Sequence, residues 1–240
     1  GGPPGMKRFE SYGHGVPGTR LDDLSGWLIV IEGTDGVGRT THINRLRRHL
    51  ERLGYAVAET GFSRSDLASR GIRRAKQGNT LGTNAFNLFY ATDFADRLEQ
   101  QIVPALRAGF VMITDRYIYS LLARAIVRGA DPDWIKQVYS FAFKPDAVFY
   151  LRITADDLVP RVLADGPFDY WESGMDMPMG EDLHDSFVNY QGRVIHELDV
   201  LARDYGFDTL DATRDVDDIE AELCERVTGL LARKVSGPAA

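Results

Sequence analysis

Residues 27–41, WLIVIEGTDGVGRTT, join an apolar run to a glycine-rich turn whose chemistry suits phosphate binding. Gly33, Gly36 and Gly38 can adopt backbone angles that let successive N–H groups point into one concavity. A helix predicted to begin near Thr40 adds the positive end of its dipole to that concavity. The pattern G-x-x-x-x-G-K-[ST] is met at every position except the lysine. The segment therefore predicts a phosphate loop, and a tight structural turn is the alternative.

The residue at the lysine position of this pattern is Arg39. Lysine carries a compact point charge, whereas arginine carries a longer planar fork that grips one phosphate from two donors. We therefore expect nucleotide binding to survive the replacement. Phosphoryl transfer is the step that depends on how Arg39 acts.

A second chemical motif is the apolar run VMIT, which is followed by Asp115 and Arg116. The carboxylate of Asp115 could bind Mg²⁺ together with the hydroxyl of Thr40, because Mg²⁺ takes few protein ligands and keeps waters and phosphate oxygens. Arg116 would then face the same crevice. The alternative is that Asp115 is an ordinary N-cap of the helix that follows. The five histidines do not have the spacing of a metal site, and we predict no structural metal.

The composition is that of one globular domain with an acidic balance. A chain of 240 residues with a net charge of −7 can bury a sizeable core and lacks the basic character typical of nucleic-acid binders. The single cysteine, Cys224, cannot form an internal disulfide and is expected to be a small buried side chain. No apolar stretch approaches the ~20 residues of a membrane span. We therefore predict a cytoplasmic protein that binds neither nucleic acid nor membrane.

Apolar runs alternate with helical patterns along the chain. Continuous apolar strands that alternate with helices are typical of a parallel sheet covered on both faces. We predict an α/β fold, with a doubly wound parallel five-stranded sheet, helices on both faces and a short lid. Ligands in such sheets bind at the carboxyl ends of the strands. The strands are expected at 27–32, 55–59, 110–114, 145–153 and 205–213, and the first helices at 41–54, 67–77 and 83–107, the last broken near Pro104.

One phosphate-loop domain is predicted at 26–233, with its lid at about 162–186. Residues 1–25 are rich in glycine and proline and lack periodicity, so they are expected to form a flexible lead-in. A flexible tail is expected at 234–240.

Several motifs together resemble the thymidylate kinase family. They are EGTDGVGRTT, FYATDFADR, ITDRYIYS, KPDAVFYLRI and DATRD, and the resemblance extends from about Leu28 to Leu231. The segments FDYWESGMDM and SFVNYQGRVIHELDVLA are similar to the lid and following helix of a divergent, thymidylate kinase-like subgroup. The resemblance implies a homodimeric enzyme that uses ATP and Mg²⁺ to phosphorylate a nucleoside monophosphate, dTMP or a relative. It also implies a mobile lid that closes over the phosphates.

The resemblance, taken with the motifs above, gives candidate site residues. The ring of Tyr90 offers a flat face to the acceptor base, although its helical spacing fits plain core packing equally well. Arg116 offers a bidentate grip on the acceptor phosphate. The candidates are Arg39, Asp35, Asp115 and Arg161 for catalysis; Gly33, Thr34, Asp35, Gly36, Val37, Gly38, Arg39, Thr40, Thr41, Thr213 and Arg214 for ATP; Asp35, Arg64, Tyr90, Phe94, Arg97, Arg116, Ser120 and Arg124 for the acceptor; and Thr40 and Asp115 for the metal.

The chain departs from the family pattern around the acceptor. Phe94 stands where a family arginine reads the pyrimidine, and Arg97 lies one turn further on. Ser120 is kept, but Arg124 replaces the tyrosine that crowds out a ribose 2′-hydroxyl. Arg124 could bind another anion.

Two further segments differ from the family. GFSRSDLASRG stands in place of T-x-E-P-G-G, and its residues 63–65 could cradle a phosphate or form a surface loop. The lid carries no lysine or arginine between Arg161 and Arg193, although phosphoryl transfer needs positive charge near the transferred group. Either Arg39 and Arg161 supply that charge or the lid acts differently. A kinase of a non-nucleotide acceptor and a nucleotide-binding protein with little catalysis therefore remain alternatives.

Overall fold

The computed structural model describes residues 9–62, 64–65, 67–78, 82–167, 171–177 and 179–235. Its centre is a five-stranded sheet of order β2-β3-β1-β4-β5 in which every neighbouring pair is parallel. The predicted parallel sheet is therefore confirmed. The strands are β1 (Trp27–Glu32), β2 (Val57–Gly61), β3 (Val111–Asp115), β4 (Ala147–Arg152) and β5 (Asp208–Asp211).

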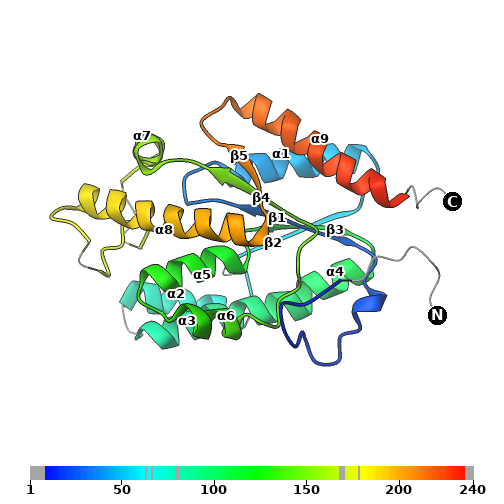
Figure 1. Ribbon diagram of the computed structural model, residues 1–240, viewed down its shortest axis with the longest axis horizontal. Coiled ribbons are helices and arrows are strands. Elements are labelled where there is room, and N and C mark those ends of the chain that lie inside the picture. The colour runs from blue at the N-terminus through cyan, green and yellow to red at the C-terminus, as the bar shows by residue number, and fades with distance from the viewer. Residues whose placement is uncertain are drawn as a thin grey trace.

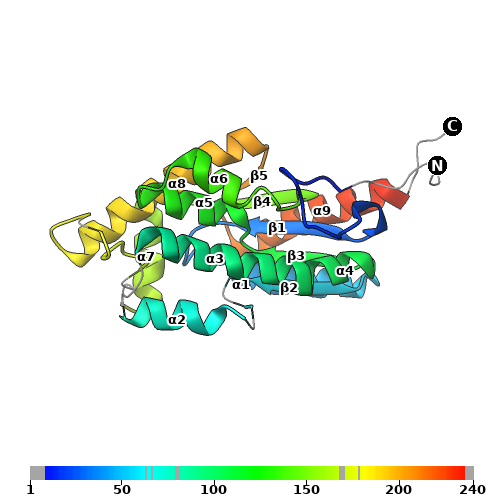
Figure 2. The ribbon, with the colours of Figure 1, turned by 90° about the horizontal axis from the view of Figure 1, so that it is seen from below.

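Helices cover both faces of the sheet, as Figure 1 shows. Helices α1 and α9 pack on one face, and α3, α4, α5 and α8 pack on the other. Figure 2 shows α2 lying beyond α3, away from the sheet. The helices are α1 (Arg39–Arg52), α2 (Ser69–Gly78), α3 (Thr83–Arg97), α4 (Val103–Arg107), α5 (Ile118–Val127), α6 (Pro132–Val138), α7 (Ala155–Asp165), α8 (Leu183–Tyr205) and α9 (Val216–Val235), with short turns η1 (Leu21–Asp23) and η2 (Leu98–Ile102).

The central strand explains why the core has two halves. Successive side chains of a strand point to opposite faces of the sheet. Leu28 and Val30 accordingly join the cluster under α3, α5 and α8, whereas Ile29 and Ile31 join the cluster under α1 and α9. Each of these four side chains is fully buried. This double burial is why the strand is a continuous apolar run in the sequence.

The helix break expected near Pro104 is a change of helix type rather than an interruption of the helix. The chain passes from α3 through the π-helical turn η2 into α4, and Pro104 lies in the first turn of α4. A proline in the first turn of a helix removes no hydrogen bond from within that helix.

Residues 9–25 differ from the flexible lead-in that was expected. Phe9 and Leu24 are buried in the larger core cluster. The backbone N–H of Tyr12 donates to the carbonyl of Ala142 at 2.9 Å, and its hydroxyl lies 2.5 Å from that of Tyr119. The apolar side chains of this segment thus gain burial over α5 and α6, which outweighs the flexibility of its glycines. Residues 1–8 and the end of the predicted tail, 236–240, lie outside the described residues, and α9 continues to Val235.

The predicted lid corresponds to the end of α7, a run of turns at 171–177 and the start of α8. Phe168, Asp169 and Tyr170 lie outside the described residues. Among the helices that the structure describes, none is both long and apolar enough to cross a membrane.

Candidate active site

The predicted phosphate loop lies between the end of β1 and the start of α1. Gly36 and Gly38 have φ angles of 78° and 97°, in the left-handed region that favours glycine. Gly38 is also the N-cap of α1, and its backbone leaves the first N–H groups of the helix without a side-chain cap. These N–H groups and the helix dipole are suited to bind an anion at the carboxyl edge of the sheet. Every residue assigned to ATP phosphates lies in this turn or in the first turn of α1, from Gly33 to Thr41.

Arg39 folds back onto the loop and across to the neighbouring strand. Its Nε donates to Oδ1 of Asp115 at 2.6 Å, and its Nη1 donates to the carbonyls of Gly33, at 2.8 Å, and of Thr34. The side chain is only 9% exposed. In this arrangement the guanidinium ties the turn to the end of β3.

The start of α5 excludes one of the two interpretations of Asp115, whereas its role as a metal ligand stays a prediction. Helix α5 begins at Ile118 with Tyr117 as its N-cap, and it has no side-chain cap hydrogen bond. Asp115 is therefore not the N-cap of that helix. It lies level with Ile31 in the β1–β3 register, beside the phosphate loop.

Asp35, inside the loop, is held by two arginines from the other side of the crevice. Arg116 Nη1 donates to its Oδ1 at 2.8 Å, and Arg124 Nη2 donates to its Oδ2 at 2.5 Å. Arg39 Nη2 is 3.8 Å from Oδ1. Burial by itself would raise the pKa of Asp35, but the charges of these arginines outweigh burial and hold that pKa well below its usual range. The carboxylate is therefore a charged anion in a cationic clamp.

Arg116 reaches this clamp through an unusual backbone conformation. It is the one described residue other than glycine with a positive φ, at 65°. Its N–H donates to the carbonyl of Ile31 at 2.9 Å, so the backbone turns sharply where β3 ends. Burial, followed by the charge of Arg39, lowers the pKa of Arg116 to about 10, so it remains charged at neutral pH. A non-glycine residue in this region is typical of a functional turn.

Glu32, at the end of β1, is a site residue that the sequence interpretation missed. It is fully buried, and its carboxylate accepts hydrogen bonds from the backbone N–H of Tyr117 at 2.8 Å and from the hydroxyl of Ser120 at 2.5 Å. Burial raises the pKa of Glu32 above its ordinary value. The signal was present as a lone acidic residue at the end of the apolar run WLIVIE. Glu32 joins the phosphate loop to the turn that carries Arg116.

A cavity of about 180 Å³ opens beside the clamp. Four predicted acceptor residues line it, namely Asp35, Tyr90, Arg116 and Arg124. It has both charged and flat aromatic walls, which suits a ligand with an anionic end and a flat end. The lining residues that were not among the candidate site residues are Lys76, Phe86, Asn87, Leu121, Arg128, Tyr139, Trp171, Glu172 and Tyr190.

The aromatic wall of the cavity runs continuously from the clamp to the lid. The guanidinium of Arg116 lies 4.7 Å from the ring centroid of Phe62. Tyr90 meets the rings of Phe62 and Phe86 edge to face, at centroid distances of 6.2 and 5.1 Å. Phe86 in turn stacks on Trp171 at 5.2 Å and 14°. Tyr90 thus belongs both to the core and to the cavity wall, which joins the two interpretations of that residue.

The remaining candidate acceptor residues do not reach the cavity. Phe94 is fully buried against the rings of Tyr117 and Tyr139, because its position on α3 faces α5 and α6. Arg97 is fully buried and forms an ion pair with Asp93 at 2.9 Å. Neither residue is placed to read a base in this structure.

Two more candidates are engaged elsewhere. The hydroxyl of Ser120 donates to Glu32 rather than facing the cavity. Arg64 is exposed, and its carbonyl accepts a hydrogen bond from Gln101 Nε2 at 3.2 Å. Ser63 lies outside the described residues, and Ser65 caps the turn before α2 through bonds to the N–H groups of residues 67 and 68.

Arg161, Thr213 and Arg214 gather on the other side of the phosphate loop. Arg161 Nη2 donates to the carbonyl of Ala212 at 2.6 Å, directly before Thr213. Arg214 pairs with Glu222 of α9. The structure therefore places Arg161 beside the turn expected to border adenine, rather than in the clamp around Asp35.

The lid segment is attached to α5 through Arg128. Its guanidinium donates to Asp176 at 2.8 Å and to the hydroxyl of Tyr190. Trp171 Nε1 donates to the carbonyl of Lys76 at 3.2 Å, which connects the lid to α2. Arg128 follows Arg124 by one helical turn, and that i, i+4 spacing is the sequence signal that could have identified it.

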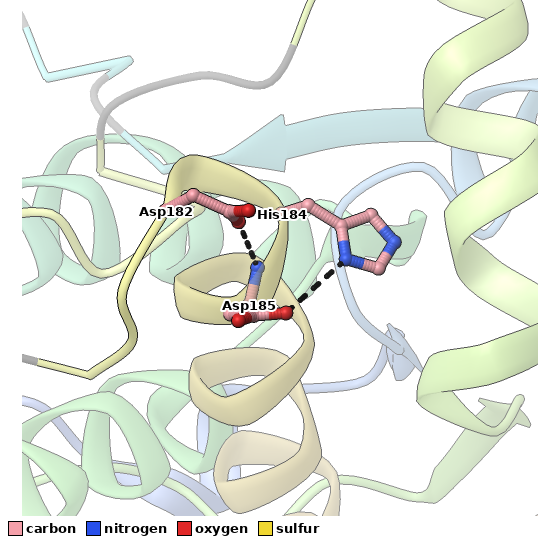
Figure 3. A group of neighbouring side chains, drawn as sticks. All are labelled: Asp182, His184 and Asp185. Atoms are coloured by element: carbon pink, nitrogen blue, oxygen red, sulfur yellow. Dashed lines mark hydrogen bonds and ion pairs between the residues drawn. The ribbon is translucent and has the colours of Figure 1, made fainter.

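Among the described residues, one group of three His and Asp side chains lies close enough together to hold a metal ion, at the start of α8 (Figure 3). Asp182 caps the helix by accepting from the N–H of Asp185 at 2.8 Å, and His184 Nδ1 is 3.7 Å from a carboxylate oxygen of Asp185. All three residues are exposed. The capping role accounts for Asp182, and the group lies outside the cavity lining.

Comparison with known proteins agrees with this geometry. A family model described as thymidylate kinase matches residues 31–222. A relative from Saccharolobus solfataricus, described as a probable thymidylate kinase 2, is 37% identical over 203 residues, which are 83% of this chain and 94% of that protein. A thymidylate kinase from Halothermothrix orenii is 30% identical over 88% of this chain and 100% of its own length. A probable thymidylate kinase from Pyrococcus horikoshii is 36% identical over 58% of this chain and 71% of that protein.

The match to the family model, residues 31–222, includes the phosphate loop, the clamp and the residues that line the cavity. This chain belongs to the thymidylate kinase family, phosphotransferases that use ATP to phosphorylate dTMP.

Proposed function

We propose that this chain transfers the γ-phosphoryl group of ATP to dTMP or a related pyrimidine nucleotide, with ATP phosphates in the loop at 33–41 and the acceptor phosphate at Arg116 and Arg124. The observation that carries the proposal is the clamp on Asp35. Two guanidinium groups already bind a carboxylate there, 2.8 and 2.5 Å from its oxygens, and a phosphate presents oxygens of the same kind.

The charge balance of the crevice supports an anionic ligand. Arg39, Arg116 and Arg124 carry three positive charges, against the two carboxylates of Asp35 and Asp115. The rest of the cavity lining holds two further positive side chains, Lys76 and Arg128, and one negative side chain, Glu172. Because these groups are held in place by the protein, they stabilise charge on the transferred group without reorganising during the reaction. We assign the charge that the lid lacks to Arg39, Arg116 and Arg124.

Thr40 and Asp115 fit a Mg²⁺ ion by the chemistry of their donors. Both offer hard oxygen atoms, one in the first turn of α1 and one at the end of the neighbouring strand β3. When bound, Mg²⁺ would neutralise phosphate oxygens of the nucleotide. Asp115 also keeps Arg39 oriented through the 2.6 Å contact.

The experiment that tests the proposal is acceptor-dependent ADP release from Mg·ATP. The acceptors are dTMP, dUMP, CMP and UMP, beside a control without acceptor. We expect ADP release that depends on a pyrimidine nucleotide and prefers dTMP. Arg116→Ala should abolish it, and Arg107→Ala, an exposed arginine at the end of α4, is the matched control that should retain it.

Two outcomes would contradict the proposal. ATP binding without turnover on any of these nucleotides would favour a nucleotide-binding protein with little catalysis. Turnover only with an acceptor that is not a nucleotide would favour a kinase of a non-nucleotide acceptor. The observation that favours this alternative is the buried Phe94 at the position of the family's base-reading arginine.

We also propose a homodimer that works in the cytoplasm. Leu88 and Phe89 of α3 are 46% and 37% exposed, and Leu67, just before α2, is 72% exposed. Leu88 and Phe89 are consecutive residues, and exposed apolar side chains that form a contiguous patch are typical of an association surface. Light scattering should give twice the mass of the chain, and a monomer at micromolar concentration would contradict this proposal.

A further inference from the structure

Asn87 lines the cavity, and its side-chain amide has a hydrogen-bond donor that no described residue accepts. It lies on α3 one turn before Tyr90, and both residues line the cavity. Its side chain is 7% exposed. Its amide nitrogen is buried and has no hydrogen-bond partner among the residues that the structure describes.

A buried amide donor without a partner costs free energy and is uncommon in folded proteins. Buried polar groups normally have a hydrogen-bond partner. For a group in the wall of a cavity, a bound ligand can supply that partner. Asn87 lies next to Phe86, which contacts Tyr90 and stacks on Trp171. The unpaired donor is therefore embedded in the flat aromatic wall rather than in the arginine clamp.

The cavity lining holds other polar groups, among them a second donor and the carboxylate of Glu172. Lys76 lines the cavity, and its Nζ lies 6.0 Å from the ring centroid of Tyr90. An ammonium group can donate hydrogen bonds and cannot accept them. Two donors beside an aromatic face match a flat ring that carries exocyclic carbonyl oxygens.

We propose that Asn87 determines which base the acceptor carries, by donating a hydrogen bond from its amide to the 4-keto oxygen of a pyrimidine. This inference rests on the proposed function, because it takes the acceptor phosphate to lie at Arg116 and Arg124. A 4-keto pyrimidine satisfies the amide donor, whereas the 4-amino group of cytosine presents a second donor to it. Asn87 thereby performs the selection that the buried Phe94 cannot perform.

The test measures equilibrium binding of dUMP and dCMP by calorimetry, without ATP. These two nucleotides differ at the 4-position of the ring, so their affinity ratio reports on the keto group. Wild type should prefer dUMP by roughly 10-fold to 100-fold, the effect of one hydrogen bond and of the donor left unpaired when it is lost. Asn87→Asp replaces the donor by an acceptor and should lower or invert that ratio by at least about 10-fold.

A matched control separates this effect from the added charge. Asn84→Asp makes the same change one turn earlier on α3, at an exposed position outside the cavity lining. It should leave the ratio unchanged. Asn87→Ala is the second variant, which removes the donor without adding charge and should reduce dUMP affinity more than dCMP affinity. Melting temperatures of the unliganded variants confirm that each is folded.

The outcomes separate this inference from the proposed function. An unchanged ratio in folded Asn87→Asp and Asn87→Ala, or an equal loss for both nucleotides, would overturn the role of Asn87 while wild-type ADP release with dTMP still supports the kinase. A wild type that binds neither nucleotide and releases no ADP with dTMP would overturn both.

Discussion

Replacing Arg39 tests whether this residue holds the phosphate loop together before any nucleotide binds. Its guanidinium reaches Asp115 at 2.6 Å and the carbonyls of Gly33 and Thr34, so one side chain joins both ends of the turn to β3. Arg39→Ala removes all of these bonds at once. Arg39→Lys keeps the charge but offers a single ammonium group in place of the planar fork.

The magnitude follows from the burial of the contact. Breaking a buried ion pair by removing one partner costs about 3–5 kcal/mol. The side chain of Asp115 is 17% exposed, so water recovers part of that cost, and we expect Arg39→Ala to lower the free energy of unfolding by about 2–4 kcal/mol. For a chain of 240 residues this lowers the melting temperature by about 4–16 °C. Arg39→Lys should lose roughly half as much, because one of the fork's contacts can be retained.

The assay is a double-mutant cycle in urea with Arg39→Ala, Asp115→Ala and the double variant. The coupling energy should be about 1.5–3 kcal/mol, the range for a hydrogen bond to a charged group. Arg48→Ala, an exposed arginine on the same helix, is the matched control and should change stability by less than about 0.5 kcal/mol. A coupling energy within about 0.5 kcal/mol of zero would refute the argument that this pair stabilises the loop.

Three further variants test single features of the site. Burial raises the pKa of Glu32 above its unfolded value, so its stability contribution is present below the unfolded pKa and is lost as pH rises through the folded pKa. Glu32→Gln should therefore gain melting temperature relative to wild type as pH rises above the unfolded pKa, and a gap independent of pH would count against this. Phe94→Ala should lower the free energy of unfolding in urea by about 3–5 kcal/mol without changing the preference among acceptors. An altered preference would show that Phe94 contributes to the acceptor site. Arg128→Ala removes the contact to Asp176 and should raise the KM for the acceptor more than the KM for ATP in steady-state kinetics, and equal changes would argue against a role in holding the lid.

The local features of the site could be predicted from the sequence because they depend on short segments. The glycines of the phosphate loop and the helix after it occupy neighbouring positions, and their backbone preferences fix the turn. The apolar runs predicted a parallel sheet because strands buried on both faces need apolar side chains at every position. The second strand was placed at 55–59 and lies at Val57–Gly61, since pairing with β3 rather than apolarity sets its ends.

The acceptor site was predicted less completely, for a physical reason. The family pattern assigns Phe94 and Arg97 by their spacing from Tyr90 on one helix. Spacing along a helix says which residues share a face, but it does not say which face meets the cavity and which meets α5. The cavity wall is formed by Asn87 and Tyr90, and the packing of α3 turns Phe94 into the core.

The sequence by itself determined the phosphate loop, the order of strands and helices and the chemical types available at the carboxyl edge. Only the tertiary structure decided their partners. Asp35 is 81 residues from Arg116 and 89 from Arg124, and Arg39 is 76 residues from Asp115. These contacts form because parallel strands bring the ends of distant segments to one edge, and the direction of each side chain there is set by what packs around it.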